Sequence, residues 1–358
     1  MALGASSTTA IGVAQVKYPD LTQQADGVVV GKISRAQNSS SGAKLALLVD
    51  RVIKGSFTPG ETISLAWNGP PPSRAPGQPW GDYGIWFLQS AGPNWRIVQI
   101  PAAQSLETSC YRRPEGTLPP ATATTGTAAP SPVELMLAEL TNAAEKFDPH
   151  GFEFIQTIDS FFHMPPSPAL TAAFRQMSQS TNPNVKVLGL IGLITGGDSA
   201  SLGLLPLENT PPLNRFGGGR MGWAISTVRD SAPVTVRELG SIATGKNVPL
   251  GIRQCAAEAL AKIHTKETLP FAALFLDSQD VTLQKWGLDA FSRFVMNLPI
   301  EKPEMLTTMA WMKPQGPAPY SSPETDRHIA GPGIPESKLP EYISFWKAWW
   351  SQMQNHLK

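Results

Sequence analysis

One octapeptide has almost the residue spacing of a phosphate-binding loop. Gly240 to Asn247 reads Gly-Ser-Ile-Ala-Thr-Gly-Lys-Asn. A nucleotide site of this kind needs backbone amides around the phosphates, a lysine for the terminal phosphates and a Ser or Thr hydroxyl for magnesium. The last position here is Asn, and Pro249 follows where the helix of such a motif should already be running. We therefore interpret the segment as the turn that ends a helix.

The other motifs with catalytic spacing are also incomplete. Ser41 and Lys44 have the S-x-x-K spacing of a serine acylase, but the S-D-N and K-T-G partners are absent and the stretch reads as a hairpin loop. The sequence holds no G-x-S-x-G and no H-E-x-x-H motif. We therefore predict no catalytic residues, no cofactor and no enzymatic activity.

The histidines and cysteines do not form a metal-binding pattern. His150 and His163 are 13 residues apart, which places them several turns apart, so they cannot chelate one ion from one helix face. Cys110 and Cys255 lie in no CxxC or CxxH motif and are interpreted as unpaired thiols. We predict no metal, and interpret the five histidines as surface or capping residues.

The loop from Asn68 to Asp82 is the best binding candidate in the sequence. It is long and holds three consecutive prolines, and long ordered loops often carry function. Arg74, Trp80 and Tyr83, the last just beyond the loop, are of residue types that anchor contacts. They are the candidate binding residues, and one hypothesis is that this loop grips a peptide or a glycan. The alternative is a proline-stiffened loop with Trp80 packed back onto the protein.

Composition excludes several classes of protein. The 358-residue chain is only 16% charged and has a net charge of +1, so no global field attracts nucleic acid or an anionic membrane. No run reaches the eighteen apolar residues needed to cross a bilayer, so no transmembrane segment is expected. The N-terminus lacks the basic and apolar regions of a signal peptide. We favour an extracytoplasmic protein, periplasmic or secreted, whose leader has been removed; a cytosolic protein is the alternative.

Residues 26–100 alternate short apolar runs with turn signals, the pattern of an antiparallel β structure. The predicted strands cover residues 28–33, 45–53, 62–67, 84–88 and 95–100. Connectors such as Thr58-Pro59-Gly60 carry turn chemistry. Five short strands in succession predict a small closed barrel or a sandwich.

Four motifs follow one another in this region: V-x-G-x-I at residues 29–33, Val-Ile-Lys-Gly at 52–55, Ile-Ser-Leu at 63–65 and Gly-Ile-Trp-Phe-Leu at 84–88. As a set they resemble the OB-type barrel of the netrin/TIMP-like kind found in bacterial extracytoplasmic proteins. The resemblance covers roughly residues 20–105 and implies a small, antiparallel, five-stranded OB-like barrel. This region lacks the cysteines that the family usually carries, so the family's inhibitor activity is not implied.

A change of composition separates the β region from a helical region. Residues 114–131 are mostly Pro, Thr, Ala and Gly with almost no charge, and such a stretch cannot bury enough apolar area to fold alone. Ser131-Pro132-Val133-Glu134 is then a capping box with proline at the first helical position. The predicted domains are an N-terminal tail (1–19), the OB-like barrel (20–113), a linker (114–131) and an α-helical domain (132–358).

A repeat of 31 residues runs through the helical domain. Residues 252–260 recur, with small residues on the apolar stripe, at 283–291, and residues 185–193 align with them at an offset of 67. Small residues on such a stripe let neighbouring helices approach closely. A degraded middle unit is expected near residues 223–244. No reactive group recurs with the repeat, which points to a scaffold.

Residues 183–186, 252–260 and 280–286 resemble the HEAT and HEAT-like repeat proteins. The resemblance implies an α-solenoid of stacked helix pairs. Aromatic residues between Tyr342 and Trp350 form one face of a last helix. We interpret this helix as a cap on the final repeat; a groove for a cofactor or a partner is the alternative.

The sequence therefore predicts a multidomain β + α protein, a small OB-like barrel followed by an α-helical HEAT-like solenoid. The predicted function is that of a bacterial, non-enzymatic scaffold that binds another protein or a peptide. Two alternatives stay open: a peptide- or glycan-binding module that uses the Asn68–Asp82 loop, and a lyase, since the HEAT-like family contains bilin lyases.

Overall fold

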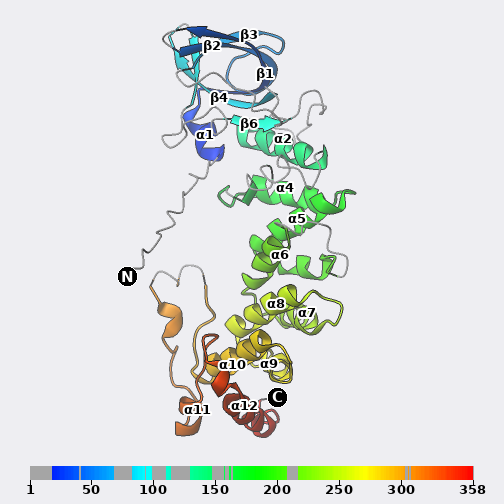
Figure 1. The fold of residues 1–358 in the computed structure, drawn as a ribbon, viewed down its shortest axis with the longest axis vertical. Coiled ribbons are helices and arrows are strands. Elements are labelled where there is room, and N and C mark those ends of the chain that lie inside the picture. Colours follow the sequence, from blue (N-terminus) through cyan, green and yellow to red (C-terminus); the bar gives the residue numbers. More distant parts are fainter. Residues whose placement is uncertain are drawn as a thin grey trace, which may run out of the picture. The chain divides into compact units, whose positions relative to one another are not determined.

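The computed structural model describes residues 18–39, 42–67, 83–92, 94–98, 110–113, 130–146, 157, 161–162, 164–207, 217–302, 305 and 308–357. The predicted tail and linker lie almost entirely outside them. The chain divides into two compact units, Met1–Ala173 and Phe174–Lys358. The first holds a closed barrel and the second a stack of helices (Figure 1). The predicted multidomain β + α architecture is confirmed.

Five strands of the first unit close into a barrel. They are β1 (Gly27–Ser39), β2 (Gly42–Lys54), β3 (Thr62–Trp67), β4 (Tyr83–Ala91) and β5 (Asn94–Ile97). Their order is β1-β2-β3-β5-β4, and pairing of β1 with β4 closes the sheet. These pairings are antiparallel except β3 with β5, which is parallel. A further strand, β6 (Cys110–Arg113), pairs with the first half of β4.

Apolar side chains from all five strands fill the barrel. Trp86, which is fully buried, donates its Nε1–H to the carbonyl oxygen of Gly31 at 2.8 Å. Gly31 must be a glycine, because a Cβ there would lie 2.3 Å from the carbonyl oxygen of Leu48. The apolar runs that predicted the strands supply this core, and in β1 and β4 consecutive residues of the runs, 28–30 and 85–88, are buried.

Helices α1 (Tyr18–Gln24) and α2 (Pro132–Lys146) pack against each other, and they contact β4 and β2 respectively. The capping box of α2 is confirmed: Ser131 N–H donates to Glu134 Oε2 at 2.7 Å, and Glu134 N–H donates to Ser131 Oγ at 3.3 Å. The first helix after the predicted linker therefore belongs to the first unit, with the barrel.

The second unit is a two-layer stack of helices. One layer consists of α5 (Pro183–Thr195), α6 (Gly217–Ser226), α8 (Leu250–Ile263) and α10 (Val281–Val295), each in contact with the next. The other consists of the 3₁₀ helix η2 (Ser199–Leu204), α7 (Pro233–Thr244), α9 (Leu269–Leu276) and α12 (Leu339–Met353). The layers confirm the predicted α-solenoid.

The other helices described below lie before α5 in the sequence or between α10 and α12. The last turn of α4 (Pro168–Ser178) packs on α5, and the short helices η5 (Ala310–Met312), α11 (Pro323–Arg327) and η6 (Glu336–Lys338) connect α10 to α12.

The 31-residue repeat corresponds to α8 and α10, the two best-matched helices of the first layer. Its small residues are buried between helices, among them Ala256 and Gly287. The predicted middle unit is α6 with α7. The segment 240–247 forms the end of α7 and the turn after it, and a Cβ at Gly240 would lie 2.2 Å from the ring of Phe271. The segment that has the spacing of a phosphate-binding loop is thus the end of a helix.

Replacing Gly189 with alanine should lower the free energy of unfolding of the second unit by about 1–3 kcal/mol. The new Cβ would lie 2.2 Å from the backbone nitrogen of Ser178 and 2.6 Å from the carbonyl oxygen of Phe174. Backbone atoms cannot rotate away, so α4 would have to shift against α5. Denaturant unfolding followed by far-UV circular dichroism measures the loss.

Gly251 is the matched control for this substitution. It also lies in a first-layer helix, α8, but nothing lies within 4 Å of the position that a Cβ would take there. Gly251→Ala should raise stability by up to about 1 kcal/mol, because alanine has the higher helix propensity. Equal effects of the two substitutions would contradict the close approach of α4 and α5.

Helix α12 covers the end of α10. Trp346 is fully buried and stacks on Phe291 of α10, with ring centroids 5.5 Å apart. Its Nε1–H donates to the carbonyl oxygen of His328 at 2.9 Å. Trp349 and Trp350 are partly buried against the same cluster. This is the packing that a cap on the last repeat requires.

Candidate functional site

Of the three residues predicted to bind a ligand, only Tyr83 lies among the residues that the structure describes. Arg74 and Trp80, with the rest of the loop Asn68–Asp82, lie outside the described residues, so their role stays a prediction. Tyr83 is only 9% exposed, and its hydroxyl donates to Oδ2 of Asp50 on β2. Its side chain is held in a polar network of the first unit.

This network continues from Asp50 to helix α2. Nη1 of Arg51 donates to Asp50 Oδ2 at 2.6 Å, while its Nε and Nη2 donate to the two carboxylate oxygens of Glu139 at 2.6 and 2.9 Å. Such a bidentate contact is the strong and directional form of an arginine–carboxylate pair. Glu139 is 4% exposed, so the pair fastens α2 to β2.

The arginine of this pair stays charged. Burial by itself would lower the pKa of Arg51, but the hydrogen bond and charge of Glu139, followed by Tyr83 and Asp50, raise that pKa on balance. A cation held this way stays protonated near neutral pH. The network can position and bind, and it offers no proton for acid–base chemistry through Arg51.

A hollow of about 400 Å³ lies beside the ion pair. Three elements line it, namely β2, the β2–β3 connection and α2, with residues Arg51, Val52, Ile53, Phe57, Pro59, Leu135 and Glu139. Mostly apolar walls with a few convergent polar groups are typical of a ligand-binding site. We take this hollow as the candidate binding site of the first unit.

Comparison with known proteins gives no match. No family model, curated protein or solved structure aligns significantly with this chain. The role of each site therefore has to be argued from its own residues.

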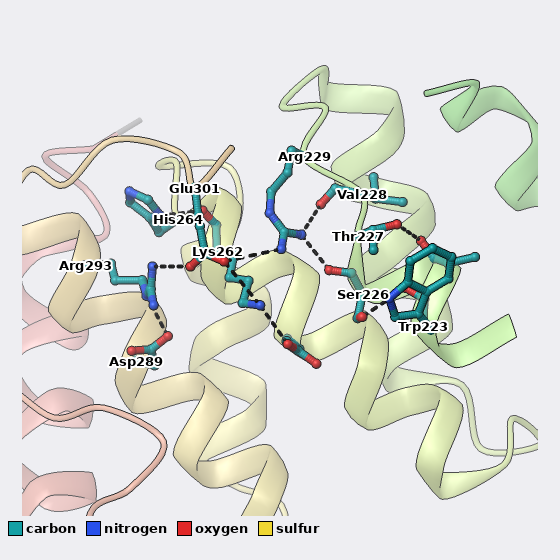
Figure 2. A network of polar contacts seen from close by, with 12 residues as sticks. Trp223, Ser226, Thr227, Val228, Arg229, Lys262, His264, Asp289, Arg293 and Glu301 are labelled. Atoms are coloured by element: carbon teal, nitrogen blue, oxygen red, sulfur yellow. Dashed lines mark hydrogen bonds and ion pairs between the residues drawn. The ribbon is translucent and has the colours of Figure 1, made fainter. Parts of the chain in front are cut away.

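A second polar network lies in the helical unit and is centred on Glu301 (Figure 2). One oxygen of Glu301 is 3.4 Å from Nζ of Lys262 and 3.8 Å from Nη2 of Arg229, and the other is 3.4 Å from Nη1 of Arg293. These cations come from the α6–α7 connection, from α8 and from α10. A single carboxylate, 7% exposed, therefore ties the α6–α7 connection to α8 and α10.

Two ion pairs of the i,i+4 type extend this network. Lys262 pairs with Glu258 at 2.8 Å in α8, and Arg293 pairs with Asp289 at 2.7 Å in α10. The second pair is the first one moved by the repeat offset, since 289 − 258 and 293 − 262 both equal 31. A charged pair therefore recurs with the repeat, in addition to the small apolar residues. Aligning charged positions, as well as apolar ones, would have found it.

The Glu301 network has the properties of a structural cluster. Each of its cations lies within 4 Å of a carboxylate, and Arg229 also donates to the carbonyl oxygens of Ser226 and Val228 at the end of α6. Burial lowers the pKa of Arg229, although Glu301 and Glu258 oppose the shift. Compensated charges of this kind resist rearrangement, because separating any pair leaves a buried charge.

As the pH rises from about 4 to about 6, the deprotonation of Asp289 should lower the stability of the folded state. Burial raises the pKa of Asp289 to about 6, against the charge and hydrogen bond of Arg293, while an unfolded aspartate has a pKa of about 3.9. Over this range the folded state binds more protons than the unfolded state. The free energy of unfolding therefore decreases with rising pH, by up to about 3 kcal/mol, and is level above the range.

Comparison with Asp289→Asn isolates this contribution, because the variant lacks the titrating group. The unfolding free energy of the wild type minus that of the variant should decrease as the pH rises from about 4 to about 6. If the difference grows instead, Arg293 outweighs burial and the pKa of the carboxyl is lowered.

The described part of the chain offers little other reactive chemistry. There, no three His, Cys, Asp or Glu side chains are placed to hold a metal ion. No described helix is long and apolar enough to span a bilayer. Cys255 is a free thiol whose pKa is raised by burial and by the charge of Glu258. The side chain of Cys110, and residues His150 and His163, lie outside the described residues.

Proposed function

We propose that this chain is a non-enzymatic interaction protein whose stacked helices present a contact surface to a partner protein. The observation that carries the proposal is an open groove of about 460 Å³ between α9 and α12. Apolar residues dominate its lining, which consists of Lys266, Pro270, Ala273, Leu274, Asp277, Trp350, Gln354 and Leu357. Exposed apolar patches with a charged rim are typical of interaction surfaces.

The exposure of Leu274 is the clearest sign of this surface. Leu274 is 56% exposed, while its neighbours Phe275 and Leu276 in α9 are buried. Asp277 at the rim is already paired with Lys347 of α12 at 2.5 Å, whereas Lys266 forms no ion pair among the described residues. The surface therefore suits a partner that brings an apolar side chain to Leu274 and a carboxylate to Lys266.

The finer assignments belong to the same proposal. A HEAT-like solenoid is a common scaffold for protein contacts, because each repeat adds surface. A netrin/TIMP-like barrel fits a bacterial extracytoplasmic protein, and we propose that compartment. The repeat offset and the strand motifs support these two family assignments.

A photo-reactive residue at position 274 tests the proposal in the cells that produce the protein. We expect crosslinks to one defined partner from position 274 and none from Ser241, an exposed position on α7 outside the groove. Equal crosslinking from both positions, or none from position 274, would reject the groove as a contact surface.

Leu274→Asp should abolish that contact without unfolding the protein. Since the side chain is largely exposed, the free energy of unfolding should change by no more than about 0.5 kcal/mol. Thermal unfolding of the variant checks this. A large loss of stability would mean that Leu274 serves packing and is not available to a partner.

A further inference from the structure

One stretch of strand β2 has a neighbouring strand on one side only. Strand β3 pairs with β2 at residues 43–48, and β1 pairs with β2 as far as Lys54. The last bonds toward the β3 side join Val49 to Gly60 and Glu61. Within the part of the chain that the structure describes, residues 51–54 therefore form a free strand edge. Such an edge offers backbone N–H and C=O groups to another extended chain.

The hollow of the first unit runs along this edge. Its lining includes the three consecutive residues Arg51, Val52 and Ile53. The pairing of β2 with β1 is bulged at Asp50 and Ile53, so side chains do not alternate strictly in this stretch. The hollow touches three consecutive residues and therefore follows the strand. Leu135 of α2 and Phe57 of the β2–β3 connection are apolar residues of the same lining, and Phe57 also packs on the barrel core.

Arg51 brings unused hydrogen-bond donors to the hollow. Its guanidinium has five N–H groups, of which the contacts with Asp50 and Glu139 use one on Nε, one on Nη1 and one on Nη2. One N–H on each terminal nitrogen remains for a carbonyl oxygen. The side chain is 17% exposed, so these donors can be reached.

The charge of the network indicates what kind of chain would fit. Asp50, Glu139 and Arg51 carry a net charge of −1, being two carboxylates and one guanidinium. The ammonium of Lys54, the last residue of the edge, donates to the carbonyl oxygens of Thr22, Gln23 and Ala25 and does not line the hollow. Glu139 is held on both oxygens by Arg51, but the side chain of Asp50 is 47% exposed. A basic side chain near Asp50 would complement this charge, and an acidic one would be repelled.

We propose that this edge and its hollow bind an extended peptide segment of a partner protein. The segment adds a strand to β2 at residues 51–54, places an aliphatic side chain against Phe57 and Leu135, and brings a lysine or arginine to Asp50. Main-chain hydrogen bonds supply affinity in this mode of recognition, while the pocket and the charge supply specificity. The site lies in the first unit and the α9–α12 groove lies in the second, so each proposal can be rejected without affecting the other.

The test uses the full-length chain and a defined probe, the peptide acetyl-Val-Lys-Val-Lys-Val-amide with a fluorescent label. We expect saturable binding by fluorescence anisotropy, together with slower hydrogen exchange at the amides of residues 51–54. N-methylation of the peptide amides on one edge should weaken binding by about tenfold or more, because it removes two or more strand hydrogen bonds. Methylation of the opposite edge should leave binding unchanged.

Two protein variants and a second peptide complete the test. Leu135→Arg fills the hollow and should weaken binding by about tenfold, whereas Val133→Arg, a partly exposed position on α2 outside the hollow, should not. The peptide with glutamates in place of lysines should bind more weakly. Absence of saturable binding, equal binding of both methylated peptides, or protection elsewhere than residues 51–54 would overturn the proposal.

Discussion

Glu301→Gln should lower the free energy of unfolding of the helical unit by about 3–5 kcal/mol, the usual cost of removing one partner from a buried ion pair. Glu301 is the carboxylate that Arg229, Lys262 and Arg293 share, at 3.8, 3.4 and 3.4 Å. Glutamine keeps the shape but removes the charge. The loss should appear in denaturant unfolding followed by far-UV circular dichroism.

The physical reason is the imbalance that the substitution leaves behind. Three cations would then face only two carboxylates, those of Glu258 and Asp289, which already pair with Lys262 and Arg293. Arg229 would keep the carbonyl oxygens of Ser226 and Val228 and the more distant charge of Glu258. A half-buried guanidinium without a counter-charge is costly.

Glu336→Gln is the matched control for Glu301. Glu336 is exposed and forms no ion pair among the described residues, so its substitution should change stability by less than about 0.5 kcal/mol. Similar losses in both variants would show that the Glu301 network contributes no more than a surface charge does.

Trp346→Ala should cost about 3–5 kcal/mol of unfolding free energy, because it empties the largest buried site of the C-terminal helix. Trp346 is fully buried, stacks on Phe291 and donates to the carbonyl oxygen of His328. Removing the indole creates a cavity between α10 and α12 and leaves that carbonyl without its donor. The same unfolding measurement applies, and α12 should lose its protection from hydrogen exchange first.

Trp223→Ala provides the comparison for the same change of side chain. Trp223 lies on α6 and is 50% exposed, so its loss should cost less than about 1 kcal/mol. If the two tryptophan substitutions have equal effects, α12 does not cover α10 as the structure indicates.

The strands and the repeated helices were predictable because they depend on local periodicity. Short apolar runs between turn signals, from residue 28 to residue 100, predicted strands that the structure contains, and the capping box at Ser131 predicted where α2 begins. The 31-residue offset predicted that α8 and α10 are equivalent units. It carried a second signal as well, since the pair Glu258–Lys262 recurs as Asp289–Arg293.

The contacts that define the candidate sites depend on pairs distant in the sequence. Arg51 and Glu139 are 88 residues apart, and neither residue type nor spacing links them. The same holds for Arg229 and Glu301, whose contact requires the connections of two helix pairs to meet.

The sequence by itself determined a β region, a helical repeat and the absence of familiar catalytic motifs, because each is written in residues close together along the chain. Only the tertiary structure decided that β1 closes on β4, that β2 keeps a free edge beside a hollow among the described residues, and that one buried carboxylate joins α8, α10 and the α6–α7 connection. The physical reason is that closure, burial and charge compensation arise between side chains that only folding brings together.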